Sequence, residues 1–209
     1  MLKRFLCVAV VPALVLCGCG NPADDKPEAQ VGKAATGKPQ PVRGHAYVFS
    51  DDSKIQFVGS KVTGSHNGGF NEFVGQFNLV DNDPSKSSVE VTIDATSLWA
   101  DNERLTGHLK SPDFFDVEAH PSIHFTSTAI TPEGEGYKVT GNLQLHGVTK
   151  SITFPATIHA DADRITAQAE FFIQRFDFDI AFKGKADDLI RDEVVIKLNL
   201  VATPGPDAS

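Results

Sequence analysis

Cysteine is scarce in this chain of 209 residues, and its three copies, Cys7, Cys17 and Cys19, all precede residue 20. From residue 20 onwards the chain can therefore form no disulfide and offers no thiol for nucleophilic catalysis or metal binding. Stability in this region has to come from an apolar core instead of covalent cross-links.

Positive charge is also in short supply. The chain has 19 Lys and Arg residues against 27 Asp and Glu residues, which gives a formal net charge of −8. The basic residues form no cluster of the kind that contacts a phosphate backbone, so no nucleic-acid partner is predicted. Long apolar runs are absent after the N-terminus, so no transmembrane helix is predicted there.

The N-terminus has the organisation of a secretory signal. Lys3 and Arg4 precede an apolar run, Phe5 to Leu16, that is too short to span a bilayer. The run ends in Leu16-Cys17-Gly18-Cys19, which resembles a bacterial lipobox. We therefore predict a lipoprotein signal peptide over residues 1–18 and an acylated Cys19 that holds the protein on a membrane. The alternative is an ordinary signal peptide that happens to contain cysteines.

The position after Cys19 bears on localisation. Gly20 stands where an Asp would resemble an inner-membrane retention signal. The sequence thus predicts the periplasmic side of a bacterial membrane, with the outer membrane favoured. Residues 19–43 have almost no large apolar side chain, which predicts a disordered tether with a reach on the order of 25–30 Å. Residues 203–209 are predicted to be a flexible tail.

Residues 45–202 are predicted to form one all-β domain. Apolar and polar residues alternate in eight segments, which is typical of strands with one buried face. Short turns connect them, so neighbouring strands should be antiparallel. The segments are 55–57, 72–79, 89–95, 123–129, 139–145, 152–158, 165–171 and 194–200. Eight such strands suggest a closed barrel or a two-sheet sandwich, and closure would remove exposed edges.

Two stretches interrupt the alternation. Residues 101–115, DNERLTGHLKSPDFF, read as a short helical insertion between the third and fourth strands, with Asp101 or Asn102 as its cap. This helix could cover one mouth of a barrel. The apolar positions then change parity near Gln174 and Arg175, which predicts either a bulge or the end of a strand.

The inward face of the predicted barrel mixes large and small apolar residues. Small inward side chains favour a cavity, although they could also serve packing in a filled barrel. A cavity with such walls would suit a long apolar chain. The predicted tunnel lining is Phe57, Phe77, Val91, Ile93, Phe125, Gly141, Leu143, Leu145, Phe154, Ala169 and Phe171.

Four ordered segments resemble the YceI-like family. They are HLKSPDFFDVEAHPSIHF (108–125), GNLQLHGVTKSITF (141–154), FFIQRFDF (171–178) and IRDEVVI (190–196). The resemblance implies an eight-stranded antiparallel lipocalin-like barrel that binds polyisoprenoid chains, such as polyprenyl or quinone-type tails. It also implies a bacterial, mostly periplasmic, stress-linked protein with no established catalytic reaction. Arg191 departs from the family's usual Gly, and Thr106-Gly107 replaces an Arg-Asp pair.

Three polar residues are candidates for the rim of the barrel: His108, Arg175 and Asp177. His108 could bond a ligand head group or anchor the helix to a strand. Arg175 and Asp177 could form an ion pair or meet a ligand phosphate or hydroxyl. His120 and His124 would be roughly 13 Å apart on one strand face, so no metal site is predicted.

The leading hypothesis is a membrane-tethered carrier or sequestering protein for an isoprenoid or other long-chain lipid. Such a lipid is the only bound group expected, and the sequence leaves open whether two barrels pair as a homodimer. The first alternative is an enzyme on an apolar substrate that uses His108, Arg175 or Asp177. The second is a filled barrel that serves as an interaction scaffold.

Overall fold

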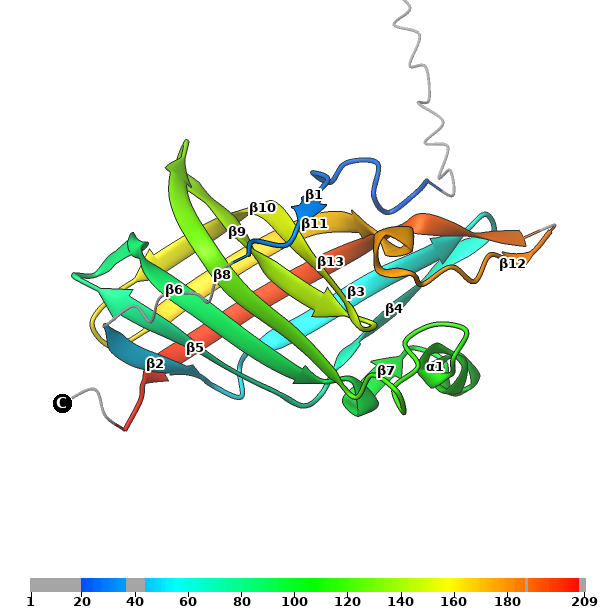
Figure 1. The fold of residues 1–209 in the computed structure, drawn as a ribbon, viewed down its shortest axis with the longest axis horizontal. Helices are drawn as coiled ribbons and strands as arrows, with labels where there is room; N and C mark the ends of the chain where they lie inside the picture. The colour runs from blue at the N-terminus through cyan, green and yellow to red at the C-terminus, as the bar shows by residue number, and fades with distance from the viewer. Residues whose placement is uncertain (1–19, 37–43, 187, 207–209) are drawn as a thin grey trace, which may run out of the picture.

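The computed structural model describes residues 20–36, 44–186 and 188–206. Within them the chain is mostly β-strand, with one α-helix and two 3₁₀ turns (Figure 1). The strands are β1 (Gln30–Lys33), β2 (His45–Phe49), β3 (Lys54–Lys61), β4 (Gly64–Phe70), β5 (Phe73–Val80), β6 (Asp83–Asp94), β7 (Leu98–Ala100), β8 (Ser122–Glu133), β9 (Gly136–Leu145), β10 (Val148–Ala160), β11 (Ile165–Gln174), β12 (Gly184–Lys185) and β13 (Asp188–Pro204). The helix is α1 (Glu103–Lys110), and the turns are η1 (Ala95–Ser97) and η2 (Arg175–Phe178).

Eight antiparallel strands close into a barrel, as predicted. The circuit runs β2-β5-β6-β8-β9-β10-β11-β13 and returns to β2. Its members differ from the predicted set at one place, because β2 closes the circuit and the predicted strand 55–57 lies in β3. The long strand β13 explains the difference, because it pairs with two strands in turn. It pairs with β2 only at Ala202–Pro204 and with β3 along its earlier part. β3 then pairs with β4, and β4 pairs with β7.

The helical insertion lies between β6 and β8, at one end of the barrel (Figure 1). Asn102 caps it, since its side chain accepts a hydrogen bond from the Leu105 amide at 3.0 Å. The later parity change is the end of a strand and not a bulge. β11 stops at Gln174, and the turn η2 follows. Asp179, whose φ of 58° is left-handed, caps the end of η2.

The N-terminal segment corrects the predicted tether over residues 20–36. β1 pairs with β10 from Gln30–Thr153 to Lys33–Lys150, and the Ala29 amide donates to the Phe172 carbonyl at 2.8 Å. Ala29 is only 3% exposed. The segment needs no large apolar side chains, because it is held by main-chain hydrogen bonds to strand edges that are otherwise unpaired.

Those edges exist because β10 and β11 separate. The two strands pair only from Thr157–Gln168 to Ala160–Ile165, after which β1 lies along β10 and its preceding residues contact Phe172. The predicted signal peptide, Cys19 and residues 37–43 lie outside the described residues.

The predicted tail begins too early. β13 includes Thr203 and Pro204, and the Gly205 amide donates to the Ala46 carbonyl at 2.8 Å. Residues 207–209 lie outside the described part of the chain.

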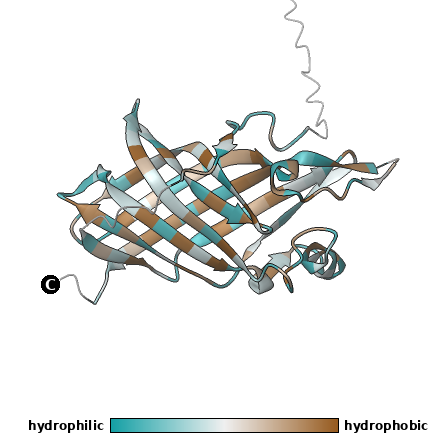
Figure 2. Ribbon diagram, in the orientation of Figure 1, coloured by the Kyte–Doolittle hydropathy of each residue, from teal (hydrophilic) through white to brown (hydrophobic). Residues whose placement is uncertain are grey.

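Apolar and polar residues alternate along the barrel strands (Figure 2). The buried apolar side chains form one main cluster inside the barrel, joined by Leu109, Phe114 and Val117 from the helical insertion. A register shift between Ser127 and Ala129 reverses the faces of β8. For this reason Ala129, which regular alternation over residues 123–129 would place on the inner face, is exposed, and Ile130 is buried. No helix in the described residues has the length and apolar character needed to cross a membrane.

Candidate functional site

The interior of the barrel holds a cavity of about 430 Å³. Its lining along β13 extends from Ile190 to Leu200, which at a rise of about 3.3 Å per residue corresponds to a length of roughly 30 Å. The cavity is therefore elongated along the barrel. This elongated form suits an extended chain better than a compact ligand.

The apolar body of the cavity is the stretch walled by the barrel strands away from α1 and η2. Ten of the residues predicted for the tunnel lie in the cavity lining, and they come from seven different strands: Phe57, Phe77, Val91, Ile93, Phe125, Leu143, Leu145, Phe154, Ala169 and Phe171. Phe154 and Phe171 stack with their ring centroids 4.2 Å apart. These contacts join β10 to β11 on the inside, where the two strands do not pair.

Gly141 is the exception among the predicted lining residues, because it does not line the cavity. A Cβ at this position would stand 2.4 Å from the Phe125 ring and 2.6 Å from the Thr126 carbonyl oxygen. The missing side chain therefore lets Phe125 pack across β9 and provides no room for a ligand. Ala156 and Ala169 do line the cavity.

The helical insertion closes one side of the cavity. Leu105 and Leu109 of α1, and Phe114 and Phe115 after it, all line the cavity. The Phe115 ring packs against Phe57 and Phe70, with centroids 6.1 and 5.9 Å away. At the opposite end, the Tyr47 hydroxyl donates to the Ala162 carbonyl at 2.8 Å and ties β2 to the β10–β11 turn.

His108 anchors the helical insertion. Its Nε2 lies 2.8 Å from Asp113 Oδ2, and its ring packs edge-on against Phe114 and Phe182. The residue does not line the cavity itself. Its contact with Phe114, which does, makes its effect on the cavity indirect.

Arg175 and Asp177 do not pair with each other as one alternative predicted. The Arg175 side chain is buried and donates to the carbonyls of Ile180, Ile190 and Arg191. Burial lowers the pKa of Arg175 from its usual value, and the nearby Asp192 carboxylate opposes that shift. Asp177 instead lies 3.1 Å from Lys150 Nζ and is absent from the cavity lining, whereas Arg175 is part of that lining.

Three further basic residues that the sequence did not single out for a site also line the cavity: Lys61, His66 and Arg191. Together with Arg175 they form what we call the basic end. Lys61 is paired with Ile190 across β3 and β13, His66 with Gly59 across β3 and β4, and Arg175 bonds the carbonyls of Ile190 and Arg191. The only feature of the sequence that pointed to this cluster was Arg191, which stands where the family usually has Gly.

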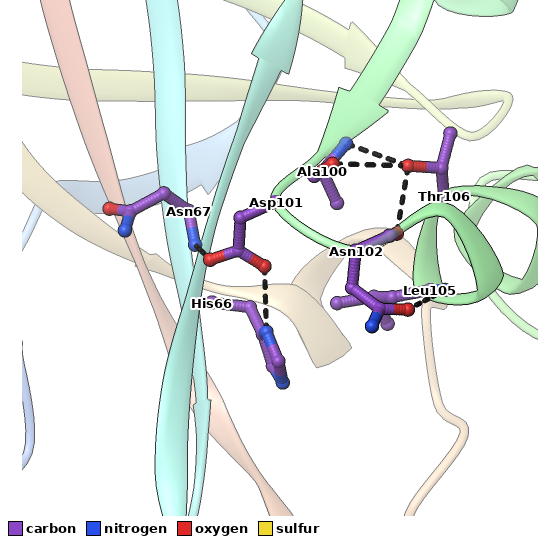
Figure 3. Close-up of polar contacts among 7 residues, drawn as sticks. All are labelled: His66, Asn67, Ala100, Asp101, Asn102, Leu105 and Thr106. Carbon is purple, nitrogen blue, oxygen red and sulfur yellow. Dashed lines mark hydrogen bonds and ion pairs between the residues drawn. The ribbon is translucent and has the colours of Figure 1, made fainter.

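His66 is held by an acidic partner (Figure 3). Its Nδ1 lies 2.7 Å from Asp101 Oδ1, and the other carboxylate oxygen accepts the Asn67 amide at 2.8 Å. The hydrogen bond from the Asn67 main-chain amide, and after it the hydrogen bond with His66, lower the pKa of Asp101. Thr106 of α1 bonds the main chain of Ala100 next to this pair, so the helix and β4 are fixed to the same short segment.

The described residues contain no group of three or more His, Cys, Asp or Glu side chains placed to hold a metal ion. His108, Arg175 and Asp177 do not converge on one point, because each is engaged by different neighbours. What the site offers chemically is a long apolar channel with donors at one end.

Comparison with known proteins places this chain in a protein family. A model of the YceI-like domain matches residues 47–202, and the chain belongs to this family. Among curated relatives, a UPF0312 protein of Pectobacterium carotovorum is 39% identical over 119 residues, which are 54% of this chain and 62% of the relative. A UPF0312 protein of Pseudomonas putida is 38% identical over 118 residues, or 56% and 58% of the two chains. The matches thus span less than two thirds of these relatives.

Solved structures share the barrel. Burkholderia cenocepacia BcnA matches with a TM-score of 0.66 and 29% identity, over 72% of this chain and 96% of that protein. A polyisoprenoid binding domain from Saccharophagus degradans, implicated in plant cell wall breakdown, matches with a TM-score of 0.62. It covers 78% of this chain and the whole of that domain, at 17% identity, so this likeness concerns the fold.

Proposed function

We propose that this protein binds a long-chain isoprenoid or similar amphiphilic lipid inside its barrel, as a membrane-tethered carrier or sequestering protein. The observation that carries the proposal is the cavity, which is elongated, roughly 30 Å long and walled mainly by aliphatic and aromatic side chains. Its volume of about 430 Å³ lies within the usual range of ligand pockets, about 300–1,000 Å³. Each CH₂ group moved from water into such a channel contributes about 0.8 kcal/mol.

Family membership supports the same ligand class. One structure with this fold is a polyisoprenoid binding domain. The cavity also argues against the filled-barrel scaffold, which requires a packed interior. The enzyme alternative has little support, because the three residues on which it depends are held apart by their own partners.

The tether that we propose is short. An acyl group on Cys19 would place the membrane anchor four residues before Ala23, which is buried against Val58 and Val195 on the outer face of the barrel. Four residues span at most about 14 Å. A lipidated protein on the periplasmic side of a bacterial membrane would therefore keep its barrel against the bilayer, where a lipid could pass between the two. We also propose that the protein takes part in a stress response.

Mass spectrometry of organic extracts tests the binding function. Protein purified without detergent should carry an isoprenoid or other long-chain lipid, and delipidated protein should take one up again. Ala169→Phe places a phenyl ring in the channel and should abolish uptake. Ala129→Phe, the same change at an exposed position, should leave uptake unchanged. Purified protein that carries no lipid and takes none up would contradict the proposal.

A further inference from the structure

The charged residues of the cavity lining all have the same sign. Lys61, His66, Arg175 and Arg191 are its ionisable members, and no Asp or Glu among the described residues belongs to the lining. This is a local property, because the chain as a whole has a net charge of −8. All four lie at one end of the channel. The cavity therefore has one basic end, and the rest of its length is mainly apolar.

Three of the four basic residues already have partners. Lys61 forms an ion pair with Asp188, and His66 forms a hydrogen bond with Asp101. Arg175 donates to three main-chain carbonyls. Arg191 differs, since its side chain has no salt bridge or hydrogen bond within the described part of the chain, and its Nε is buried.

Arg191 lies in an irregularity of β13. Ile190 pairs with Lys61 and Val194 with Gly59, so residues 191–193 stand opposite the single residue Ser60. Such a bulge redirects side chains and is common beside binding sites. Both Arg191 and Ser60 contribute to the cavity lining at this point.

Ser60 repeats the feature seen in Arg191. It is 7% exposed, and its hydroxyl is buried without a hydrogen-bond partner among the described residues. Only one other side-chain atom in that part of the chain shares this state, the Ser50 hydroxyl. A buried donor without an acceptor is costly and uncommon, so two of them at one bulge call for an acceptor.

We propose that the basic end binds the head group of the amphiphile, and that this head group is an anionic oxygen group, a phosphate or a carboxylate. The proposal rests on the lipid-binding function proposed above. The Arg191 guanidinium supplies the charge and, with the Ser60 hydroxyl, the donors. Guanidinium groups match the oxygens of phosphates and carboxylates in geometry as well as in charge. The apolar tail then occupies the body of the cavity.

The test compares probes that share one tail. Geranylgeranyl monophosphate, geranylgeranoic acid and geranylgeraniol are titrated into delipidated full-length protein below their critical micelle concentrations. The wild type should bind at least one of the anionic probes about tenfold or more tightly than the alcohol, as expected for a charge-assisted hydrogen bond. The stronger of the two anions identifies the head group as phosphate or carboxylate.

Arg191→Gln should remove this preference while it changes the affinity for the alcohol less than twofold. Lys183→Gln is the matched control, because Lys183 is exposed and outside the lining, although its carbonyl bonds the Ile190 amide at the same end. It should keep the preference. If Arg191→Gln does not fold, Arg191→Lys retains the charge and should retain at least part of the preference for anions.

The outcomes separate the two proposals. Equal binding of all three probes by the wild type would overturn the head-group assignment and leave lipid binding intact. Failure of all three to bind would contradict the lipid-binding function itself. If Lys183→Gln and Arg191→Gln lose the preference for anionic probes equally, the preference comes from general surface charge. That result would also overturn the assignment.

Discussion

The apolar body of the cavity and its basic end are built from different kinds of sequence. The body is a set of alternating residues on regular strands, in which most inward side chains have apolar cross-strand neighbours. The basic end gathers residues from β3, β4, β13 and η2, and it depends on a bulge and a 3₁₀ turn. The body can therefore tolerate changes that conserve volume, whereas the basic end depends on individual hydrogen bonds.

The largest expected effect of a single substitution lies at the basic end. Arg175→Met should lower the free energy of unfolding by about 3 kcal/mol, because three main-chain carbonyls lose their donor and each buried acceptor costs roughly 1–3 kcal/mol. Removal of the buried charge offsets part of this loss. Urea denaturation measures the change, and Arg164→Met, at an exposed position, should alter stability by less than about 0.5 kcal/mol. Equal stability of the two variants would mean that Arg175 does not hold this end together.

A glycine pair compares the two regions directly. Gly141→Ala should destabilise the wall of the body by about 1–3 kcal/mol, because the new Cβ meets the Thr126 carbonyl, a main-chain atom that cannot move aside easily. Gly59→Ala, at the basic end, should be neutral or slightly stabilising, since nothing lies within 4 Å of its Cβ position. Thermal or urea unfolding of both variants checks this contrast. The opposite order would show that the wall relaxes around Phe125.

The body could be predicted from sequence because its signal is local. Alternation at period two places a residue on the inner or outer face without reference to distant segments. The residues predicted for the tunnel, other than Gly141, lie in the cavity lining. Alternation could not place Gly141 correctly, because an inward glycine can either leave room for a ligand or make room for a neighbouring aromatic ring. Only the position of Phe125 on the paired strand decides between them.

The basic end has no local signal of this kind. Lys61 and Arg191 are far apart in sequence, and the register that joins them includes a bulge that alternation cannot locate. His66 lies in a strand rich in glycine, whose faces are poorly marked by its side chains. β1 was missed for a related reason. Its place against β10 follows from an unpaired strand edge and not from its own composition.

The smallest expected effect concerns Asp101, whose carboxylate holds His66 in place at the basic end. The Asn67 amide and then His66 lower the pKa of Asp101 below its ordinary value of 3.8 in the folded protein. A carboxylate with a lowered folded pKa stabilises the folded state above its unfolded pKa, and this stabilisation is lost as the pH falls through the folded pKa. The wild type should therefore lose stability below about pH 4 more steeply than Asp101→Asn.

Urea unfolding at several pH values between about 2 and 6 measures the two slopes. Asp101→Asn keeps an oxygen that can accept the Asn67 amide, so the variant should stay folded and differ from the wild type mainly in this pH dependence. Asp51→Asn, at an exposed position, serves as the control and should match the wild-type slope. The effect should be small, because both side chains of the His66–Asp101 pair are more than one-third exposed and solvent screens their interaction. A slope for Asp101→Asn equal to that of the wild type would mean that the pair adds nothing to the stability of this end, and would leave Arg175 as its main support.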